Sequence, residues 1–547
     1  MIHGGVNQPN DEVSENVTCQ REFKGRERKE QIMEHTYIFD VIIKNGTIID
    51  GTGRQRYKAD LGIKDGKIKA LETDIPHESA PRVIDATDKI VCPGFIDVHC
   101  HTDWNVLDIP WDDHQERQGV TTQIGGLCGT SPLSPKEHLE KAEERGLGTN
   151  YALFAGHGSI RQEVMGNENR PPSQEELNQM KNLLQKAMDE GALGLSTGLI
   201  YEPGVFAHTE ELIEMAKVIA PMRGIYATHM RSESDDIDAA VEEAITIART
   251  AQTPLQISHI KVIMPHNWGK GERIIERIQT EQRRGLKITA DQYPYTVTGG
   301  GYYGISRLAQ GFYEETDLAR LEKEYEDKTK RKTMVEYVHS LIMERGGPQY
   351  FSIIKSSRQD ILGLFLPQAL ALLQDEQLSS EIPLPEAPSS YTFADLIVDE
   401  LYNSKGEFAL AYHAVSEVEL IQFLKQPWVM AGTDGIQGAF HPRTHGTFPR
   451  ILGRYARNMQ IISLEEAIRK ITSLPADTFG LKGRGQIMPS AIADVVVFDP
   501  DTVIDRATLV SPNLYPEGIE YVLVNGELVV DNGKRTEVFP GKAVLRT

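Results

Sequence analysis

Two histidines placed two residues apart are the first side chains that suggest chemistry. His99 and His101 follow an apolar run of strand character in FIDVHCHTD. Alternate residues of a strand point to the same side, so both imidazoles would project together from the strand end. Neutral imidazole binds zinc readily. The pair is a candidate half of a metal site, although two histidines on a solvated strand end would give the same pattern.

Four more side chains of zinc-ligand type stand at the ends of other apolar runs. They are Cys128 after VTTQIGG, His229 in GIYATHM, His259 in PLQISHI and Asp434 in WVMAGTD. Any one of them could be an ordinary core residue. Six such residues, all at predicted strand ends, favour a metal site.

The donor types predict how the site is divided. Cys128 as a thiolate, with His229 and His259, would make a tight Cys-His₂ zinc site that keeps a position open for water. The first two histidines and Asp434 could form a second, weaker site or orient water beside the first. Asp434 is the candidate general base, because a carboxylate near the metal can take the proton of water and deliver it to a leaving amine. The predicted chemistry is hydrolysis of an amide or related C–N bond.

The sequence pattern predicts that the elements that position these residues form an α/β barrel. From residue 93 to 479, short apolar runs alternate with amphipathic stretches, as in βαβ units. The runs are FIDVH, VTTQIGG, YALFAG, ALGLST, GIYATHM, PLQISHI, KITADQY and WVMAGTD. Eight runs predict a (β/α)₈ barrel with the ligands at its catalytic end. An open doubly wound sheet is the alternative, but no Gly-rich dinucleotide loop follows an early strand.

The barrel region is flanked by β-rich sequence at both ends. Residues 37–92 and 480–547 contain short β-rich runs, with hairpin signals at Asn45-Gly46, Asp65-Gly66 and Asn525-Gly526. We expect antiparallel strands, and we expect the two blocks to pair into one small β-sandwich domain. Residues 1–36 lack hydrophobic periodicity and are expected to be a disordered N-terminal extension.

A long insertion separates the last two predicted strands. The stretch from about residue 305 to 425 contains charged helical segments such as DLARLEKEYEDKTKRKTMVEYVHSLIMER and a proline-rich break, EIPLPEAPSS. We expect an inserted helical subdomain at the catalytic face, where loops vary without disturbing the core. It could act as a lid or be a solvated decoration.

The charge composition of the chain argues against some classes of binding partner. Lys and Arg number 58 and Asp and Glu number 79, for a net charge of −21, which argues against nucleic acid or an anionic membrane as the main partner. No apolar run reaches the roughly 18 residues of a membrane span. Four cysteines make no disulfide framework, and a cytoplasmic location and a small-molecule substrate are expected. The sequence does not indicate an oligomeric state.

From about residue 37 onward the chain resembles the D-aminoacylase (N-acyl-D-amino-acid deacylase) family of the amidohydrolase superfamily. The motifs are DVIIKNGTIIDGTG, PGFIDVHCHTD, QGVTTQIGGLCGTSP, GALGLSTGLIYEPG, YATHMRSE, SHIKVIMPHNWGK, DQYPY, GTDG, HPRTHGTFPRILG and YPEGIEYVLVNG. The resemblance implies zinc-dependent hydrolysis of N-acyl-D-amino acids to a carboxylate and a free D-amino acid. It implies the same ligand division, with Cys128 in the place that a carbamylated lysine holds in many binuclear relatives.

Some positions depart from the family pattern. GLCGTSP, with Leu127 and Thr130, replaces the usual GNCGFSP, Cys100 replaces the commoner Thr between the metal histidines, and SHIK replaces SHHK. The candidate ligands are intact, so these changes bear on acyl-group preference. Cys100 should point away from the metal, into the core, because it alternates with the ligand histidines.

Four residues are candidates for binding the substrate. Arg443 in HPRTHG is the first choice for the substrate carboxylate, because guanidinium matches a carboxylate bidentately. Lys261 is the second choice, Tyr293 could donate to the scissile carbonyl, and Tyr201 is a weaker candidate. The alternatives are a structural ion pair for Arg443, loop surface for Lys261 and core packing for Tyr293.

Two other functions fit the same fold. A cyclic-amide hydrolase similar to dihydropyrimidinase or dihydroorotase would normally show a bridging lysine in place of Cys128. A catalytically silent scaffold would be expected to lose ligands, whereas all six candidates are present.

Overall fold

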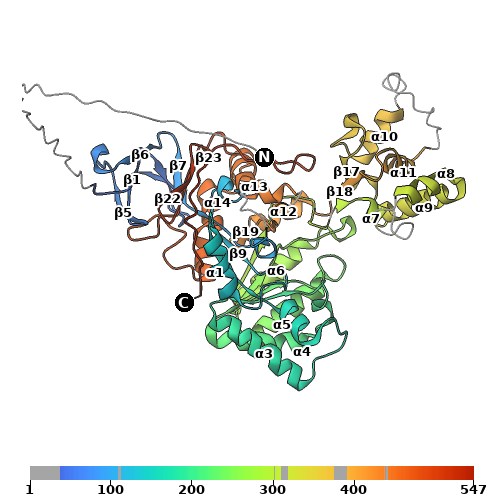
Figure 1. The fold of residues 1–547 in the computed structure, drawn as a ribbon, viewed down its shortest axis with the longest axis horizontal. Helices are drawn as coiled ribbons and strands as arrows, with labels where there is room; N and C mark the ends of the chain where they lie inside the picture. The colour runs from blue at the N-terminus through green and yellow to red at the C-terminus, as the bar shows by residue number, and fades with distance from the viewer. Residues whose placement is uncertain are drawn as a thin grey trace, which may run out of the picture. The chain divides into compact units, whose positions relative to one another are not determined.

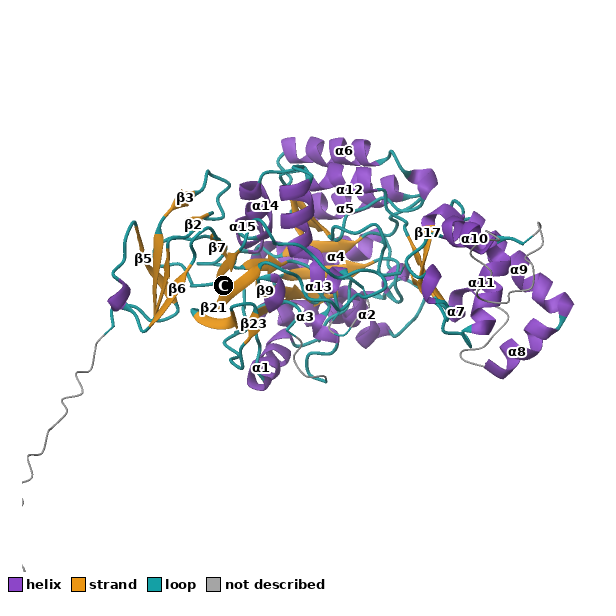
Figure 2. Ribbon diagram, turned by 90° about the horizontal axis from the view of Figure 1, so that it is seen from above, coloured by secondary structure: helices purple, strands orange, loops and turns teal. Residues whose placement is uncertain are grey.

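The barrel region is built from parallel strands (Figures 1 and 2). The computed structural model describes residues 37–108, 113–300, 302–308, 318–374, 391–436, 438 and 441–546. The expected disordered extension, residues 1–36, lies outside the described residues. The barrel strands are β8 (Phe95–Asp97), β9 (Val120–Gly125), β10 (Asn150–Leu153) with β11 (Ala155–Gly156), β12 (Gly194–Gly198), β13 (Ile225–His229), β14 (Leu255–Ile257), β15 (Ile288–Gln292) and β19 (Val429–Ala431).

Hydrogen bonds join these strands in parallel, in the orders β10-β9-β8 and β11-β12-β13-β14-β15-β19. The ring closes between β19 and β8 at their carboxyl ends. There the Asp434 N–H donates to the carbonyl of His99 at 2.7 Å, and the His101 N–H donates to the carbonyl of Gly435 at 2.7 Å. The predicted (β/α)₈ barrel is confirmed, and closure itself brings the first and last predicted ligand segments together.

Amphipathic helices cover the outside of the barrel (Figure 2). A capping box between Ser173 and Glu176 starts α3, whose buried face includes Met180 and Leu184. The helices of the barrel region are α1 (Pro135–Arg145), α2 (His157–Met165), α3 (Gln174–Asp189), α4 (Thr209–Ile219), α5 (Ile237–Ala251), α6 (Gly271–Arg283), α12 (Glu417–Leu424), α13 (Arg443–Arg450), α14 (Leu464–Ile471) and α15 (Ser473–Phe479). No helix of the described residues is long and apolar enough to cross a membrane.

Two sheets from the chain ends pack face to face around a shared apolar core that includes Ile43, Ile63, Val91 and Val497. One sheet has the order β5-β4-β1-β6 and the other the order β23-β22-β21-β20-β7-β2-β3. Their strands are β1 (Val41–Lys44), β2 (Thr47–Ile48), β3 (Tyr57–Lys58), β4 (Asp60–Lys64), β5 (Lys67–Glu72), β6 (Arg82–Asp85), β7 (Ile90–Pro93), β20 (Val495–Phe498), β21 (Ile519–Val524), β22 (Glu527–Asp531) and β23 (Lys534–Arg535). The predicted β-sandwich from both chain ends is confirmed.

Two details of the sandwich differ from the sequence-based expectation. The pairs β1–β6 and β2–β7 are parallel rather than antiparallel. Asn45-Gly46 is not a hairpin turn, because β1 and β2 belong to different sheets. Asn45 has a left-handed backbone, with φ of 64°, and its N–H donates to Asp60, so the dipeptide moves the chain from one sheet to the other. The hairpins at Asp65-Gly66 and Asn525-Gly526 are confirmed.

The insertion has a hydrophobic core of its own. The expectation was helical, but a three-stranded antiparallel sheet in the order β16-β18-β17 accompanies the helices. Its elements are β16 (Tyr302–Tyr303), α7 (Ile305–Leu308), α8 (Leu318–Glu326), α9 (Lys328–Met343), β17 (Phe351–Lys355), α10 (Leu366–Gln374), α11 (Phe393–Asn403) and β18 (Ala409–Tyr412). Helix α12, which falls inside the predicted insertion, packs on α6 and so belongs to the barrel.

A buried lysine connects α14 to the strand that leads to Asp434. Lys470 is 1% exposed, and its ammonium group donates to the carbonyls of Gln426 and Val429. Burial lowers the pKa of Lys470 to about 7. The unfolded chain would keep this proton up to about pH 10.4. Between pH 7 and 10 the unfolded state therefore binds more protons, and stability rises with pH.

We predict that Lys470→Met removes this pH dependence. The free energy of unfolding of the wild type, relative to the variant, should rise by about 2 kcal/mol from pH 7 to pH 9. Melting curves of both proteins at the two pH values measure the change. A difference that stays constant or falls would show that Lys470 remains charged in the folded protein.

Candidate metal centre

Three of the six predicted ligands have an unusual backbone where their strands end. Cys128, His259 and Asp434 have φ values of 52°, 35° and 47°. Residues other than glycine rarely adopt positive φ, and such strain of about 1–3 kcal/mol persists where the surroundings enforce it, commonly at functional sites. At each of these positions the chain leaves its barrel strand in a sharp turn with a candidate ligand at the bend.

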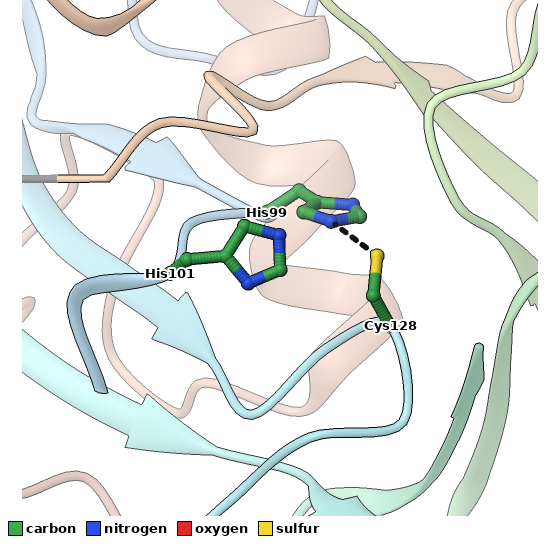
Figure 3. A group of neighbouring side chains, drawn as sticks. All are labelled: His99, His101 and Cys128. Carbon is green, nitrogen blue, oxygen red and sulfur yellow. Dashed lines mark hydrogen bonds between the residues drawn. The ribbon is translucent and has the colours of Figure 1, made fainter. Parts of the chain in front are cut away.

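The six side chains converge on one buried point. The Cys128 sulfur lies 3.4 Å from His99 Nε2, 3.7 Å from His229 Nδ1 and 3.5 Å from His259 Nε2. Figure 3 shows the imidazoles of His99 and His101 facing this sulfur from the loop after β8. All of these side chains are buried.

The carboxylate of Asp434 faces the two early histidines. Its Oδ1 lies 3.1 Å from His101 Nε2 and 3.6 Å from His99 Nε2. Three sets of ligand atoms lie within 4.8 Å of one another: His99, His101 and Cys128; Cys128, His229 and His259; and His99, His259 and Asp434. The sulfur and two of the histidines are each shared between sets, so the geometry forms one continuous cluster rather than two separate sites.

The donors fit zinc by type and by charge. Thiolate sulfur, imidazole nitrogen and carboxylate oxygen are its usual protein ligands. Burial disfavours the Cys128 thiolate, but His99 and His259 outweigh it and hold the pKa of Cys128 well below its usual range. Burial also lowers the pKa of His229, which favours the neutral imidazole that a metal requires.

Asp434 is held as a carboxylate on both of its oxygens. Oδ1 faces His101, and Oδ2 accepts a hydrogen bond of 2.6 Å from Arg443. Burial opposes ionisation, but Arg443 and His101 keep the pKa of Asp434 well below its usual range. This carboxylate is therefore oriented and charged beside the candidate ligands, as a proton acceptor must be.

Two carboxylates behind the cluster were not identified from the sequence. Asp291 is the second-to-last residue of β15, and its Oδ1 lies 3.2 Å from His99 Nδ1 and accepts from the His259 N–H at 2.9 Å. Glu233 lies 3.0 Å from His259 Nδ1. Such partners fix the orientation of ligating imidazoles. Asp291 carried the same signal as the predicted ligands, a polar residue ending an apolar run; Glu233 lies in a loop, where spacing gave no signal.

Arg443 and Tyr293 adjoin the cluster. Arg443, the first residue of α13, pairs with Asp434, and its guanidinium lies 4.6 Å from the centre of the Tyr293 ring. The Nε of Arg443 and the hydroxyl of Tyr293 are both buried without a hydrogen-bond partner among the described residues. The ion pair that the sequence analysis considered for Arg443 is present, and so is the core position that it considered for Tyr293. Each side chain nevertheless keeps one polar group without a hydrogen-bond partner near the candidate ligands.

Lys261 and Tyr201 occupy different positions. Lys261 is buried rather than on the loop surface, and its ammonium donates to Glu233 at 2.5 Å and to the His259 carbonyl at 3.0 Å. It supports His259 from behind. Tyr201 is 48% exposed, and its ring centre lies 5.0 Å from that of His229. Cys100 is fully buried in an apolar cluster and donates to the Ile124 carbonyl, away from the ligand sets, as expected.

Comparison with known proteins places the chain in a family. Residues 82–273 and 397–530 match the model of the amidohydrolase family, and residues 17–96 match the N-terminal domain of the urease alpha-subunit. N-acyl-D-glutamate deacylase of Alcaligenes xylosoxydans xylosoxydans is 31% identical over 517 residues, covering 89% of this chain and 93% of the relative. D-aminoacylase of the same organism is 32% identical over 535 residues, covering 93% and 98%.

A solved structure agrees with these relatives. N-acyl-D-glutamate deacylase from Bordetella bronchiseptica, complexed with zinc and a phosphonate inhibitor that mimics the reaction's tetrahedral intermediate, has a TM-score of 0.72 at 31% identity. The match covers 93% of this chain and 100% of that one. With the strand-end cluster of cysteine, histidine and aspartate, these likenesses show that the chain belongs to the D-aminoacylase (N-acyl-D-amino-acid deacylase) family of amidohydrolases.

Proposed function

We propose that this protein is a zinc-dependent hydrolase that converts N-acyl-D-amino acids into a carboxylate and a free D-amino acid. The observation that carries the proposal is the buried cluster in which the Cys128 sulfur lies 3.4–3.7 Å from three imidazoles while Asp434 stands beside it as an oriented carboxylate. Relatives that are 31% and 32% identical over most of the chain are an N-acyl-D-glutamate deacylase and a D-aminoacylase.

Cys128, His229 and His259 would hold the tighter zinc, and His99, His101 and Asp434 would line the second, weaker position. Zinc bound there would supply a Lewis acid and lower the pKa of water. The sharing of Cys128 between two ligand sets supports two adjacent positions.

The protein's own groups would move the proton and hold the substrate. Asp434 would accept a proton from water on its carboxylate and pass it to the leaving amine, which changes a poor leaving group into a free amine. Arg443 would bind the substrate carboxylate through the guanidinium edge that Asp434 does not use, and Tyr293 would donate its unpaired hydroxyl to the scissile carbonyl. Lys261 would act behind His259, and Tyr201 would cover the site from its exposed side.

We place the reaction in the cytoplasm. Cys92, Cys100 and Cys128 are free thiols in the described structure, and a thiolate ligand is best preserved in a reducing compartment.

We predict that the purified protein contains about one tightly held zinc per chain and hydrolyses N-acetyl-D-amino acids faster than their L-enantiomers. Chelation should abolish hydrolysis, and added zinc should restore it. Elemental analysis and amino-acid release from a panel of N-acyl D- and L-substrates measure both properties. Full activity in a metal-free preparation would refute the proposed function, as would hydrolysis of none of the N-acyl-D substrates by the zinc-loaded protein.

A further inference from the structure

Two large aromatic side chains lie half exposed directly against candidate metal ligands. Trp104, in the 3₁₀ turn Thr102–Trp104 after β8, has its ring centre 4.6 Å from that of His101 and is 48% exposed. Tyr201, after β12, has the same exposure and contacts His229. Its neighbour Ile200 is 45% exposed. Exposed aromatic surface that borders a buried polar site is typical of a ligand-binding wall.

The strand order separates these apolar residues from the cationic ones. Trp104 follows β8, and Tyr201 follows β12. These two strands stand at the two ends of one arc of the barrel, which consists of β8, β9, β10 with β11, and β12. Lys261, Tyr293 and Arg443 follow β14, β15 and β19, which are three neighbouring strands; β13, which carries His229, lies between the two arcs, and Tyr293 stands between the two cations. The catalytic end of the barrel therefore has an apolar arc and a cationic arc, with the ligand cluster between them.

The two arcs also differ in depth. Arg443 and Tyr293 are 7% and 3% exposed, whereas Trp104 and Ile200 are 48% and 45% exposed. A substrate with one charged end would place its carboxylate in the buried cationic arc, because a buried guanidinium with an unsatisfied N–H binds a carboxylate most strongly. In an N-acyl amino acid the scissile amide lies between the carboxylate-bearing carbon and the acyl group. With the amide at the ligand cluster, the acyl group must extend toward the apolar arc.

We propose that Trp104, together with Ile200 and Tyr201, forms the acyl-group subsite and that the protein prefers long or aromatic N-acyl groups to N-acetyl. This inference rests on the proposed deacylase function and deepens it. Thr130, one of the departures from the family pattern, is exposed in the loop after β9, inside the same arc. The open position of the subsite leaves room for acyl groups that a closed pocket would exclude.

The test is an acyl series on a single D-amino acid with the zinc-loaded, full-length protein. N-acetyl, N-butanoyl, N-hexanoyl and N-phenylacetyl derivatives of D-leucine, or of D-glutamate if it is hydrolysed faster, are compared by kcat/KM. A fully buried methylene is worth at most about fourfold, so a half-exposed wall should give about tenfold from acetyl to hexanoyl. An N-hexanoyl substrate no better than N-acetyl in the wild type would overturn the proposal.

Variants then assign the preference to the apolar arc. Trp104→Ala should reduce the hexanoyl-to-acetyl ratio of kcat/KM by about fivefold, chiefly through KM, and Trp104→Phe should keep most of it. Equal losses on both substrates would mean that Trp104 acts only by packing on His101, and would also overturn the proposal. Ile200 has no ring that packs on a candidate ligand, so Ile200→Ala should keep its zinc and lower the same ratio. If Trp104→Ala loses zinc, the ratio measured for Ile200→Ala tests the acyl subsite instead.

A matched control and a separate failure pattern complete the design. Phe539→Ala removes an aromatic side chain of equal exposure, 48%, that packs on Arg535 outside the site, and should leave the whole acyl series unchanged. Failure of the deacylase function would leave every N-acyl-D substrate unhydrolysed, N-acetyl included. Failure of the acyl subsite alone would leave N-acetyl substrates hydrolysed without an acyl preference.

Discussion

Asp434→Asn should lower kcat for N-acyl-D-amino acid hydrolysis by about 10²–10⁴-fold while leaving about one zinc per chain. The amide keeps the size of the side chain and an oxygen that can face His101, but it cannot accept the proton of water. The ligand set that we propose for the tighter zinc, Cys128 with His229 and His259, does not include Asp434. This variant should therefore lose turnover and keep its zinc.

Asp235 provides the matched control for this substitution. It is an exposed aspartate in the loop after β13, where it accepts hydrogen bonds from His266 at 2.6 Å and Asn267 at 2.9 Å, outside the ligand cluster. Asp235→Asn should leave kcat and zinc content as in the wild type. Normal turnover by Asp434→Asn would remove Asp434 from its role as acid and base, whereas loss of zinc together with turnover would make it a principal ligand instead.

Cys128→Ala should lose the metal. The sulfur lies within 3.7 Å of three imidazole nitrogens and belongs to two of the three ligand sets, so its removal opens both positions. Changes that only affect the partner of a ligand already weaken metal binding by about 10–100-fold, and loss of the ligand should exceed that range. Zinc should fall from about one ion per chain to near zero after dialysis, and hydrolysis should fall with it.

Cys100→Ala separates loss of a ligand from loss of a buried thiol. Cys100 stands between two predicted ligands but donates to the Ile124 carbonyl inside an apolar cluster. The variant should lose about 1 kcal/mol of stability, from one buried atom and one hydrogen bond, and keep its zinc. Retained zinc in Cys128→Ala, or zinc lost equally in both variants, would contradict the assignment of Cys128.

The sequence alone determined the strands of the barrel and the types of the candidate ligands. Each predicted barrel run contains a strand of the barrel, because buried parallel strands need apolar runs and the helices between them need an apolar face. The polar residues that end these runs were visible as interruptions, and barrel geometry places all such ends on one face. The Cys, His and Asp positions of the cluster could therefore be identified without coordinates.

Tertiary structure decided which atoms face one another. The sequence divided the ligands into two groups of three, whereas the folded chain shares Cys128, His99 and His259 between overlapping sets. This follows from ring closure at β19 and β8 and from the positive φ of Cys128, neither of which strand periodicity specifies. Non-local contacts also decided that Lys261 is buried behind His259, that Asn45-Gly46 joins two sheets, and that Trp104 lies against His101 at the exposed edge of the site.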